Sequence, residues 1–214
     1  MKTEELIESL VHDAKPVRRM PSPVLLAVAL IVTGVASSLA GAWLMGVRPD
    51  FGWEVFSRRF IMINSMLVFT LGAAAFVLST MAVPGRQRRR KVQIVFGIAV
   101  FAVLIGMFLM RWPWLYGMTW GWWLASGGIC VGRGVLLGAI PTGVGVWLHR
   151  HGAPMNPGVS GGLIGGASAT QGANATGWCC DIEEPAHVLL CHFLIPTVIL
   201  SLIGVWAGRR WLRW

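Results

Sequence analysis

Long apolar stretches separated by short polar segments dominate the pattern of this chain. A helix that crosses a bilayer needs about 20 mainly apolar residues. Five stretches clearly meet this length and composition: 24–47, 61–83, 92–110, 125–148 and 188–207. They predict membrane-spanning helices joined by short loops.

A sixth stretch, 158–177, is rich in Gly, Ala, Ser and Thr and only weakly apolar. Gly161 and Gly165 are four residues apart, and the two glycines that follow them repeat this spacing. Small residues at this spacing let helix backbones approach closely inside a membrane bundle. We therefore interpret the stretch as a helix surrounded by other helices. The alternative is a flexible glycine-rich loop outside the membrane.

The distribution of basic residues favours six spans with both chain ends in the cytoplasm. In that layout the cytoplasmic segments hold thirteen Lys and Arg, and the outer loops hold four. This follows the positive-inside rule, whereas five spans would place the basic tail 209–214 outside. We therefore predict an all-α integral membrane protein, with a six-transmembrane-helix bundle within residues 24–208.

Residues 1–23 form a polar arm ahead of the first span. Acidic residues such as Glu4 and Glu8, and an apolar run that begins only at Val24, are unlike a secretory signal peptide. We expect the arm to be retained in the cytoplasm. Apolar residues at helical spacing predict a short amphipathic helix over 3–14. The apolar stripe of this helix consists of Leu6, Ile7, Leu10, Val11 and Ala14.

The apolar stripe needs a cover, because an isolated helix of this length is marginal in water. The cover could be the membrane surface, the protein's own loops or a groove in a partner. Helices that lie on a membrane carry many Lys and Arg, whereas this one begins with acidic residues. We favour a partner groove. A partly frayed arm without a dedicated partner is the alternative.

Composition agrees with a membrane protein. The chain of 214 residues is 55% hydrophobic and 13% charged, with a mean hydropathy of +0.65. Its net charge of +9 is explained by the cytoplasmic loops, so the charge does not require a nucleic-acid partner. We expect contact with the lipid bilayer and no direct binding to nucleic acid.

The four cysteines follow no common metal or redox spacing. No C-x-x-C motif is present, so neither a thioredoxin-type nor a zinc-ribbon site is predicted, and we expect no cofactor. In the six-span layout, Cys130 and the adjacent pair Cys179 and Cys180 lie at similar depth near the outer face. Cys191 lies further inside the last span.

Several short motifs follow one another in order along the whole chain. They are Thr3–Leu10, Asp13, Pro16, Val17 and Arg19 before the first span, Gly46–Asp50 after it, Cys130 and Pro141 in the fourth span, the glycine-rich fifth span, then Cys180, Asp181, Glu183 and His187, and finally Gly208–Trp214. In this order they resemble the NrsF-type membrane anti-sigma factors. The resemblance covers essentially the whole chain.

The resemblance implies a protein that holds an extracytoplasmic-function (ECF) sigma factor inactive at the bacterial inner membrane. In such proteins the cytoplasmic N-terminal segment contacts the sigma factor. By position, the sigma-binding residues here are Leu6, Ile7, Leu10 and Val11. Two outward cysteines take part in sensing oxidative or heavy-metal stress, which implies Cys130 and Cys180 as the sensing pair.

The chain departs from a two-cysteine pattern, because it also has Cys179 and Cys191. Cys180 fits the spacing to Asp181 better, but Cys179 is the alternative. Neighbouring acids oppose formation of a thiolate, whereas His187 could offset them or join Cys180 as a metal ligand. The other interpretation of these cysteines is that they are small packing residues.

Two other function classes remain open. A membrane thiol–quinone oxidoreductase would use the same outer cysteines, but it needs a dithiol pair close in sequence, usually with a second pair to relay electrons, and no C-x-x-C motif exists here. A small transporter would need ionisable residues inside the spans, and Arg133 is the one clear example. We therefore predict a regulator and not an enzyme, with no catalytic residues.

Overall fold

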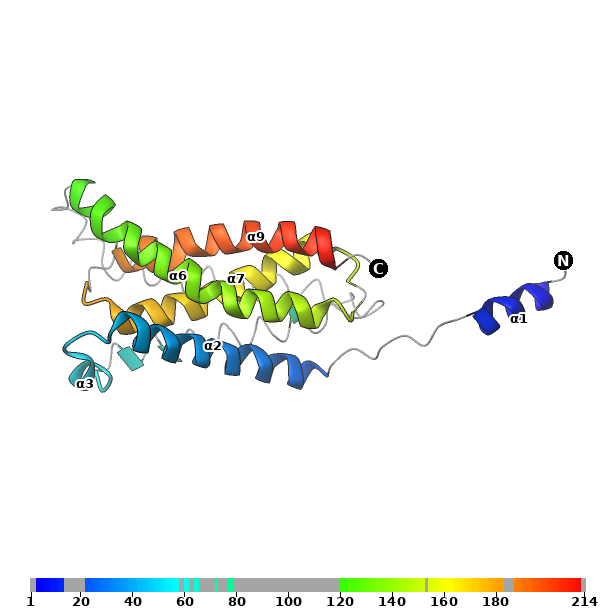
Figure 1. The fold of residues 1–214 in the computed structure, drawn as a ribbon, viewed down its shortest axis with the longest axis horizontal. Helices are drawn as coiled ribbons and strands as arrows, with labels where there is room; N and C mark the ends of the chain where they lie inside the picture. The colour runs from blue at the N-terminus through cyan, green and yellow to red at the C-terminus, as the bar shows by residue number, and fades with distance from the viewer. Residues whose placement is uncertain are drawn as a thin grey trace.

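The computed structural model describes residues 3–13, 22–57, 60–61, 64–65, 72, 77–78, 120–152, 154–182 and 187–212. All regular structure in this part of the chain is helical (Figure 1). The helices are α1 (Thr3–Asp13), α2 (Pro23–Met45), α3 (Phe51–Glu54), α6 (Trp120–His149), α7 (Pro157–Cys179), the π-helix η3 (Val188–Leu194) and α9 (Ile195–Trp211). The predicted all-α class is confirmed for the described residues.

Three of the six predicted spans are long and apolar enough to cross a membrane. They are Val24–Met45, Ser126–His149 and Val188–Trp211, close to the predicted bounds. Of the predicted span 61–83 only a few residues are described, and 92–110 lies outside the described residues. The predicted count of six is therefore not found in the part of the chain that the structure describes.

Helix α7 covers the weakly apolar stretch 158–177, so the alternative interpretation of this stretch as a glycine-rich loop is wrong. The helix is long enough to span, but its composition is less apolar than that of the other three. The physical reason is its surroundings. Most of its residues are buried against neighbouring helices, so small side chains that permit close packing replace the large apolar ones that lipid contact favours.

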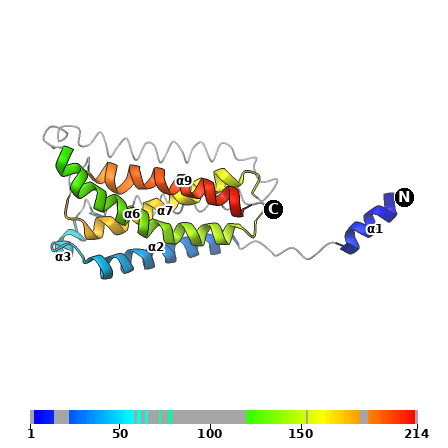
Figure 2. The ribbon, with the colours of Figure 1, turned by 45° about the horizontal axis from the view of Figure 1, so that its top comes forward.

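The long helices run alternately up and down in a bundle (Figures 1 and 2). At one end, α2 and α7 begin and α6 and α9 finish, and we call this the termini end. At the other end α6 begins and α7 finishes, and we call this the cysteine end. Because α2 starts and α9 stops at the termini end, the two ends of the bundle-forming chain lie on one side.

Glycines bring the helices into backbone contact. A Cβ atom built at Gly161 would collide with the carbonyl oxygen of Gly204 in α9, and one at Gly165 with that of Leu200. On another face of α7, a Cβ at Gly172 would collide with the carbonyl oxygen of Gly134 in α6. Helix α7 is thus held directly between α6 and α9, and the predicted close approach at Gly161 and Gly165 is confirmed.

Helix α2 completes the described bundle by packing against α6 and α7. Leu26 and Leu30 are buried, and the Ser37 hydroxyl donates a hydrogen bond of 2.5 Å to the carbonyl of Leu137 in α6. The opposite face of α2 is apolar and exposed, for example at Val32 and Leu39. Helix α9 has a similar exposed apolar face. Such faces are typical of helices that meet lipid.

The predicted arm helix is present as α1, which ends at Asp13. Ile7 and Val11 lie one turn apart, and their side chains are 55% and 69% exposed. The side chains of Leu6 and Leu10 lie outside the described part of the structure. The described residues of the apolar stripe, Ile7 and Val11, are therefore uncovered in the isolated chain.

Candidate functional site

Four buried side chains from three helical segments meet at the cysteine end. Cys130 lies in α6, Cys180 directly follows α7, and His187 and His192 belong to the start of the last helix. Each is at most 5% exposed. One ligand atom from each residue lies within 4.8 Å of those of the other three. We call these four residues the thiol–imidazole cluster.

The two sulfur atoms of the cluster lie close together. The Sγ atoms of Cys130 and Cys180 are 3.4 Å apart, and none of the four cysteines of the chain forms a disulfide. The Nε2 atom of His187 lies 3.8 Å from Sγ of Cys180. The rings of His187 and His192 meet edge to face, with centroids 5.2 Å apart. The structure thus brings together the two cysteines that the resemblance implied and adds two histidines.

A local change of helix winding places both histidines in the cluster. In an α-helix, residues five positions apart point about 140° apart, because each residue turns the chain by about 100°. In a π-helix, each N–H bonds the carbonyl five residues back, so such residues lie on one face. Val188–Leu194 is a π-helix. His187 and His192 therefore project to the same side.

Pro196 explains why the winding changes at this point. A proline has no N–H, and its ring collides with the carbonyl four residues earlier in a regular α-helix. For Pro196 that carbonyl belongs to His192. Helices inside membranes tolerate proline through local π-type adjustments of this kind. The wide turns of η3 come just before Pro196, which lies at the start of α9.

Charge in the cluster is set by the hydrogen bonds among its members. The hydrogen bond from the Cys130 thiol holds the pKa of Cys180 far below its usual range, against the effect of burial, and His187 and His192 lower this pKa further. Burial alone would lower the pKa of His187, but hydrogen bonds to Cys180 and Cys191 raise this pKa to about 9. These hydrogen bonds therefore favour the thiolate form of Cys180 and the protonated form of His187.

The other candidate cysteines take different positions. Cys179 is half-buried, and its carbonyl oxygen lies 3.4 Å from Nη1 of Arg133, which donates to it. Cys191 is buried and packs against Cys130 and Cys180 with apolar neighbours, outside the set of four ligand atoms. Arg133 of α6 therefore reaches toward the cysteine end, and Cys180 is the member of the adjacent pair that meets Cys130.

The motif Gly46–Asp50 supports the cysteine end. Gly46 ends α2 with a φ of +79°, a conformation that favours glycine. The Arg48 backbone N–H donates to the carbonyl of Trp178, and its guanidinium binds the carboxylate of Asp50 at 2.5 Å. The same hydrogen bond lowers the pKa of Asp50. This turn joins α2 to the end of α7, two residues before Cys180.

Sequence reasoning missed His192 as a site residue and named His187 only as a possible partner of Cys180. A period of 3.6 residues sends the two histidines in different directions. The available signal was Pro196, four residues after His192, because proline at this spacing disturbs α-helical winding.

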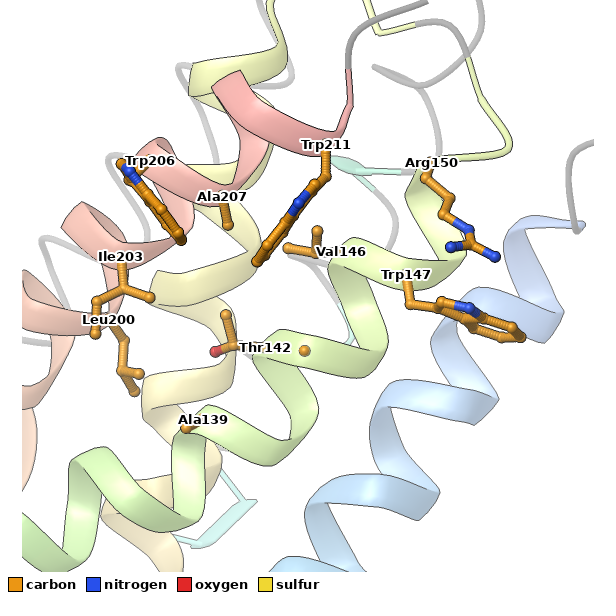
Figure 3. Close-up of a pocket in the computed structure, with 11 residues that line it drawn as sticks. Ala139, Thr142, Val146, Trp147, Arg150, Leu200, Ile203, Trp206, Ala207 and Trp211 are labelled. Atoms are coloured by element: carbon orange, nitrogen blue, oxygen red, sulfur yellow. The ribbon is translucent and has the colours of Figure 1, made fainter.

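A separate cavity of about 480 Å³ opens toward the termini end between α6 and α9 (Figure 3). Its lining is mostly apolar, with Val146, Leu200 and Trp206 among the labelled side chains. The Thr142 hydroxyl already bonds the Gly138 carbonyl, and the Arg150 guanidinium lies over the Trp147 ring. An apolar lining of this kind is typical of a surface that meets lipid chains. None of the candidate cysteines lines the cavity.

Fold and site together define an all-α bundle in which three described helices are long and apolar enough to cross a membrane, with buried thiols at one end and an amphipathic helix ahead of the bundle. The family NrsF, described as "Negative regulator of sigma F", matches residues 10–214. The chain therefore belongs to the NrsF family, which is a family of regulators. It is also 28% identical, over the full length of both chains, to the "Anti-sigma-F factor NrsF" of Caulobacter vibrioides (strain NA1000 / CB15N). No solved structure matches the chain.

Proposed function

We propose that this protein is a membrane anti-sigma factor that sequesters an ECF sigma factor through α1 and releases it when Cys130 and Cys180 react. The protein spans the bacterial inner membrane with both ends in the cytoplasm. Oxidants or thiophilic heavy metals outside are the signals. Oxidation to a disulfide would remove two protons and two electrons from the pair and pass them to the oxidant.

The observation that carries the proposal is the uncovered apolar stripe of α1. Ile7 and Val11 are exposed on a helix that precedes the bundle. Short amphipathic helices of this kind dock into apolar grooves of partner proteins through residues spaced at i, i+3 and i+4. A relative over the full chain carries the name of an anti-sigma factor. A sigma factor is therefore the partner that we propose for the stripe.

The proposed sidedness rests on charge. The termini end is where α2 begins and α9 ends, and α9 finishes with Arg209 and Arg210. Clusters of basic residues next to spans mark the cytoplasmic side. The cysteine end then faces outward, where thiols meet oxidising conditions.

The route between the two ends runs through α7. The thiol–imidazole cluster links α6, α7 and the last helix, and α7 contacts α6 and α9 backbone to backbone at Gly172 and Gly161. We propose that reaction of Cys130 and Cys180 shifts these packed helices, which continue to the termini end. Helix α2, which follows α1 in the chain, begins there.

Deletion of residues 1–22 tests the proposed partner. The tagged full-length protein, purified in mild detergent from its native host, should bring a sigma factor with it, and the truncated protein should lose it by at least about tenfold. Quantitative mass spectrometry of co-purified proteins measures this. A sigma factor retained equally by both forms would refute binding through the arm.

The double variant Cys130→Ser, Cys180→Ser tests sensing. Sigma binding without stress should stay within about twofold of the wild type, because α1 is intact. Release under oxidant or cadmium should fall by at least about tenfold, measured with a sigma-dependent reporter. Cys179→Ser is the matched control, since Cys179 neighbours Cys180 but lies outside the cluster, and this variant should respond normally. A normal response from the double variant contradicts the sensing role.

A further inference from the structure

The thiol–imidazole cluster has the composition and the spacing of a four-coordinate metal site. Tetrahedral zinc sites use Cys and His ligands with Zn–S of about 2.3 Å and Zn–N of about 2.0–2.1 Å, which places ligand atoms about 3.3–3.8 Å apart. The Sγ atoms of Cys130 and Cys180 are 3.4 Å apart, and Sγ of Cys180 and Nε2 of His187 are 3.8 Å apart. All four ligand atoms fall within 4.8 Å of one another.

We infer that Cys130, Cys180, His187 and His192 bind one divalent cation of borderline or soft character, of the Zn²⁺ and Cd²⁺ class, in a closed Cys₂His₂ site. The inference deepens the proposed function, because it names the ligand of the sensing cysteines and adds two residues to them. As a binding site it stands on the geometry alone.

Ligand type selects the class of cation. Thiolates favour Zn²⁺, Cd²⁺ and similar ions over hard ions such as Mg²⁺ and Ca²⁺, which require oxygen ligands. The four members of the cluster offer sulfur and nitrogen only. Asp181, the described acid nearest in sequence, is exposed and is not one of the four ligands.

Charge balance favours two thiolates with two imidazoles. A dication held by two thiolates and two neutral imidazoles forms a site with no net charge. A buried site needs this balance, because an uncompensated charge away from water is very costly. In the bound state Cys130 and Cys180 would both be thiolates and the two histidines would be neutral rings, so binding releases the protons that these groups still hold.

Burial adds a reason for a ligand at this place. His192 is 2% exposed, and its Nε2 atom has no hydrogen-bond partner within the described residues. A buried polar atom without a partner is costly.

The geometry of the site depends on the π-helix η3. His187 and His192 share a face only because η3 is wound with five-residue hydrogen bonds, as described above. π-Turns inside helices occur frequently at functional sites. The same segment therefore supplies half of the ligands and fixes their direction.

Metal titration of the full-length reduced protein in detergent micelles tests the inference. Co²⁺ serves as the spectroscopic probe, because tetrahedral thiolate ligation gives intense visible d–d and sulfur charge-transfer bands, and Zn²⁺ or Cd²⁺ should displace it. We expect one equivalent per chain. His192→Ala and Cys180→Ser should each weaken Zn²⁺ binding by at least about tenfold.

A matched control keeps the result specific. Cys179→Ser removes a neighbouring thiol outside the cluster, and this variant should bind Zn²⁺ within about threefold of the wild type. The inference is overturned if the wild type binds less than about a tenth of an equivalent, or if His192→Ala binds as tightly as the wild type.

The outcomes separate this inference from the proposed function. If the wild-type protein binds no metal while the Cys130→Ser, Cys180→Ser protein has lost its stress response, the metal site is wrong and thiol sensing stands. If one equivalent of Zn²⁺ binds and the double variant still responds normally, the metal site stands and the sensing role is wrong.

Discussion

Replacing Ile7 and Val11 with serine should reduce the affinity for the sigma factor by at least about 100-fold. Both side chains are exposed on α1 and would be buried in a partner groove. Full burial of a large aliphatic side chain is worth about 1.5–3 kcal/mol, and each 1.4 kcal/mol is a tenfold change in affinity. Biolayer interferometry with immobilised full-length protein and the purified sigma factor would measure the loss.

Serine substitution at Glu4 and Glu8 is the matched control for this pair. These positions have the same four-residue spacing on the same helix and are also exposed. Glu→Ser lowers helix propensity at least as much as Ile→Ser or Val→Ser does, but it leaves the apolar stripe whole. Affinity should stay within about fivefold of the wild type. An equal loss in both double variants would mean that helix formation, and not the stripe, determines binding.

Replacing Gly161 and Gly165 with alanine should destabilise the bundle by about 2–6 kcal/mol. Each added Cβ would collide with a backbone carbonyl oxygen of α9, and backbone cannot move aside as a flexible side chain can. Overpacking typically costs about 1–3 kcal/mol per site. Thermal unfolding in detergent, followed by circular dichroism, should show a clearly lower midpoint.

Gly177→Ala, in contrast, should not destabilise the bundle. Gly177 lies in the same helix, but a Cβ there meets no described atom within 4 Å. Alanine is about 1 kcal/mol more favourable than glycine within a helix. This variant should be as stable as the wild type or slightly more stable. Destabilisation equal to that of the Gly161 and Gly165 variant would show that glycine is needed for a reason other than close packing.

Apolar length and small-residue spacing predicted much of the described fold. The spans near 24–47, 125–148 and 188–207, the helix at 158–177 and the arm helix all follow from patterns with a period of 3.6 residues. Such patterns report on local winding and burial. The close approach at Gly161 could be predicted because small residues four apart have one common use in bundles.

The candidate site was only half predictable from the sequence. Cys130 and Cys180 came from a resemblance in the order of motifs, and no spacing rule joins residues fifty positions apart. His192 was missed because its direction depends on the π-turns of η3. These turns arise from the position of Pro196, whereas a period of 3.6 residues implies regular α-helical winding throughout the last helix.

The winding of η3 also sets the rotation of α9 about its own axis. A π-helix accommodates an extra residue, and one residue of an α-helix corresponds to about 100° of rotation about its axis. If η3 rewound as regular α-helix, α9 would turn relative to His187, and Arg209 and Arg210 would face a different direction at the far end. Bonds that hold His187 and His192 on one side therefore also fix the rotation of α9 about its axis.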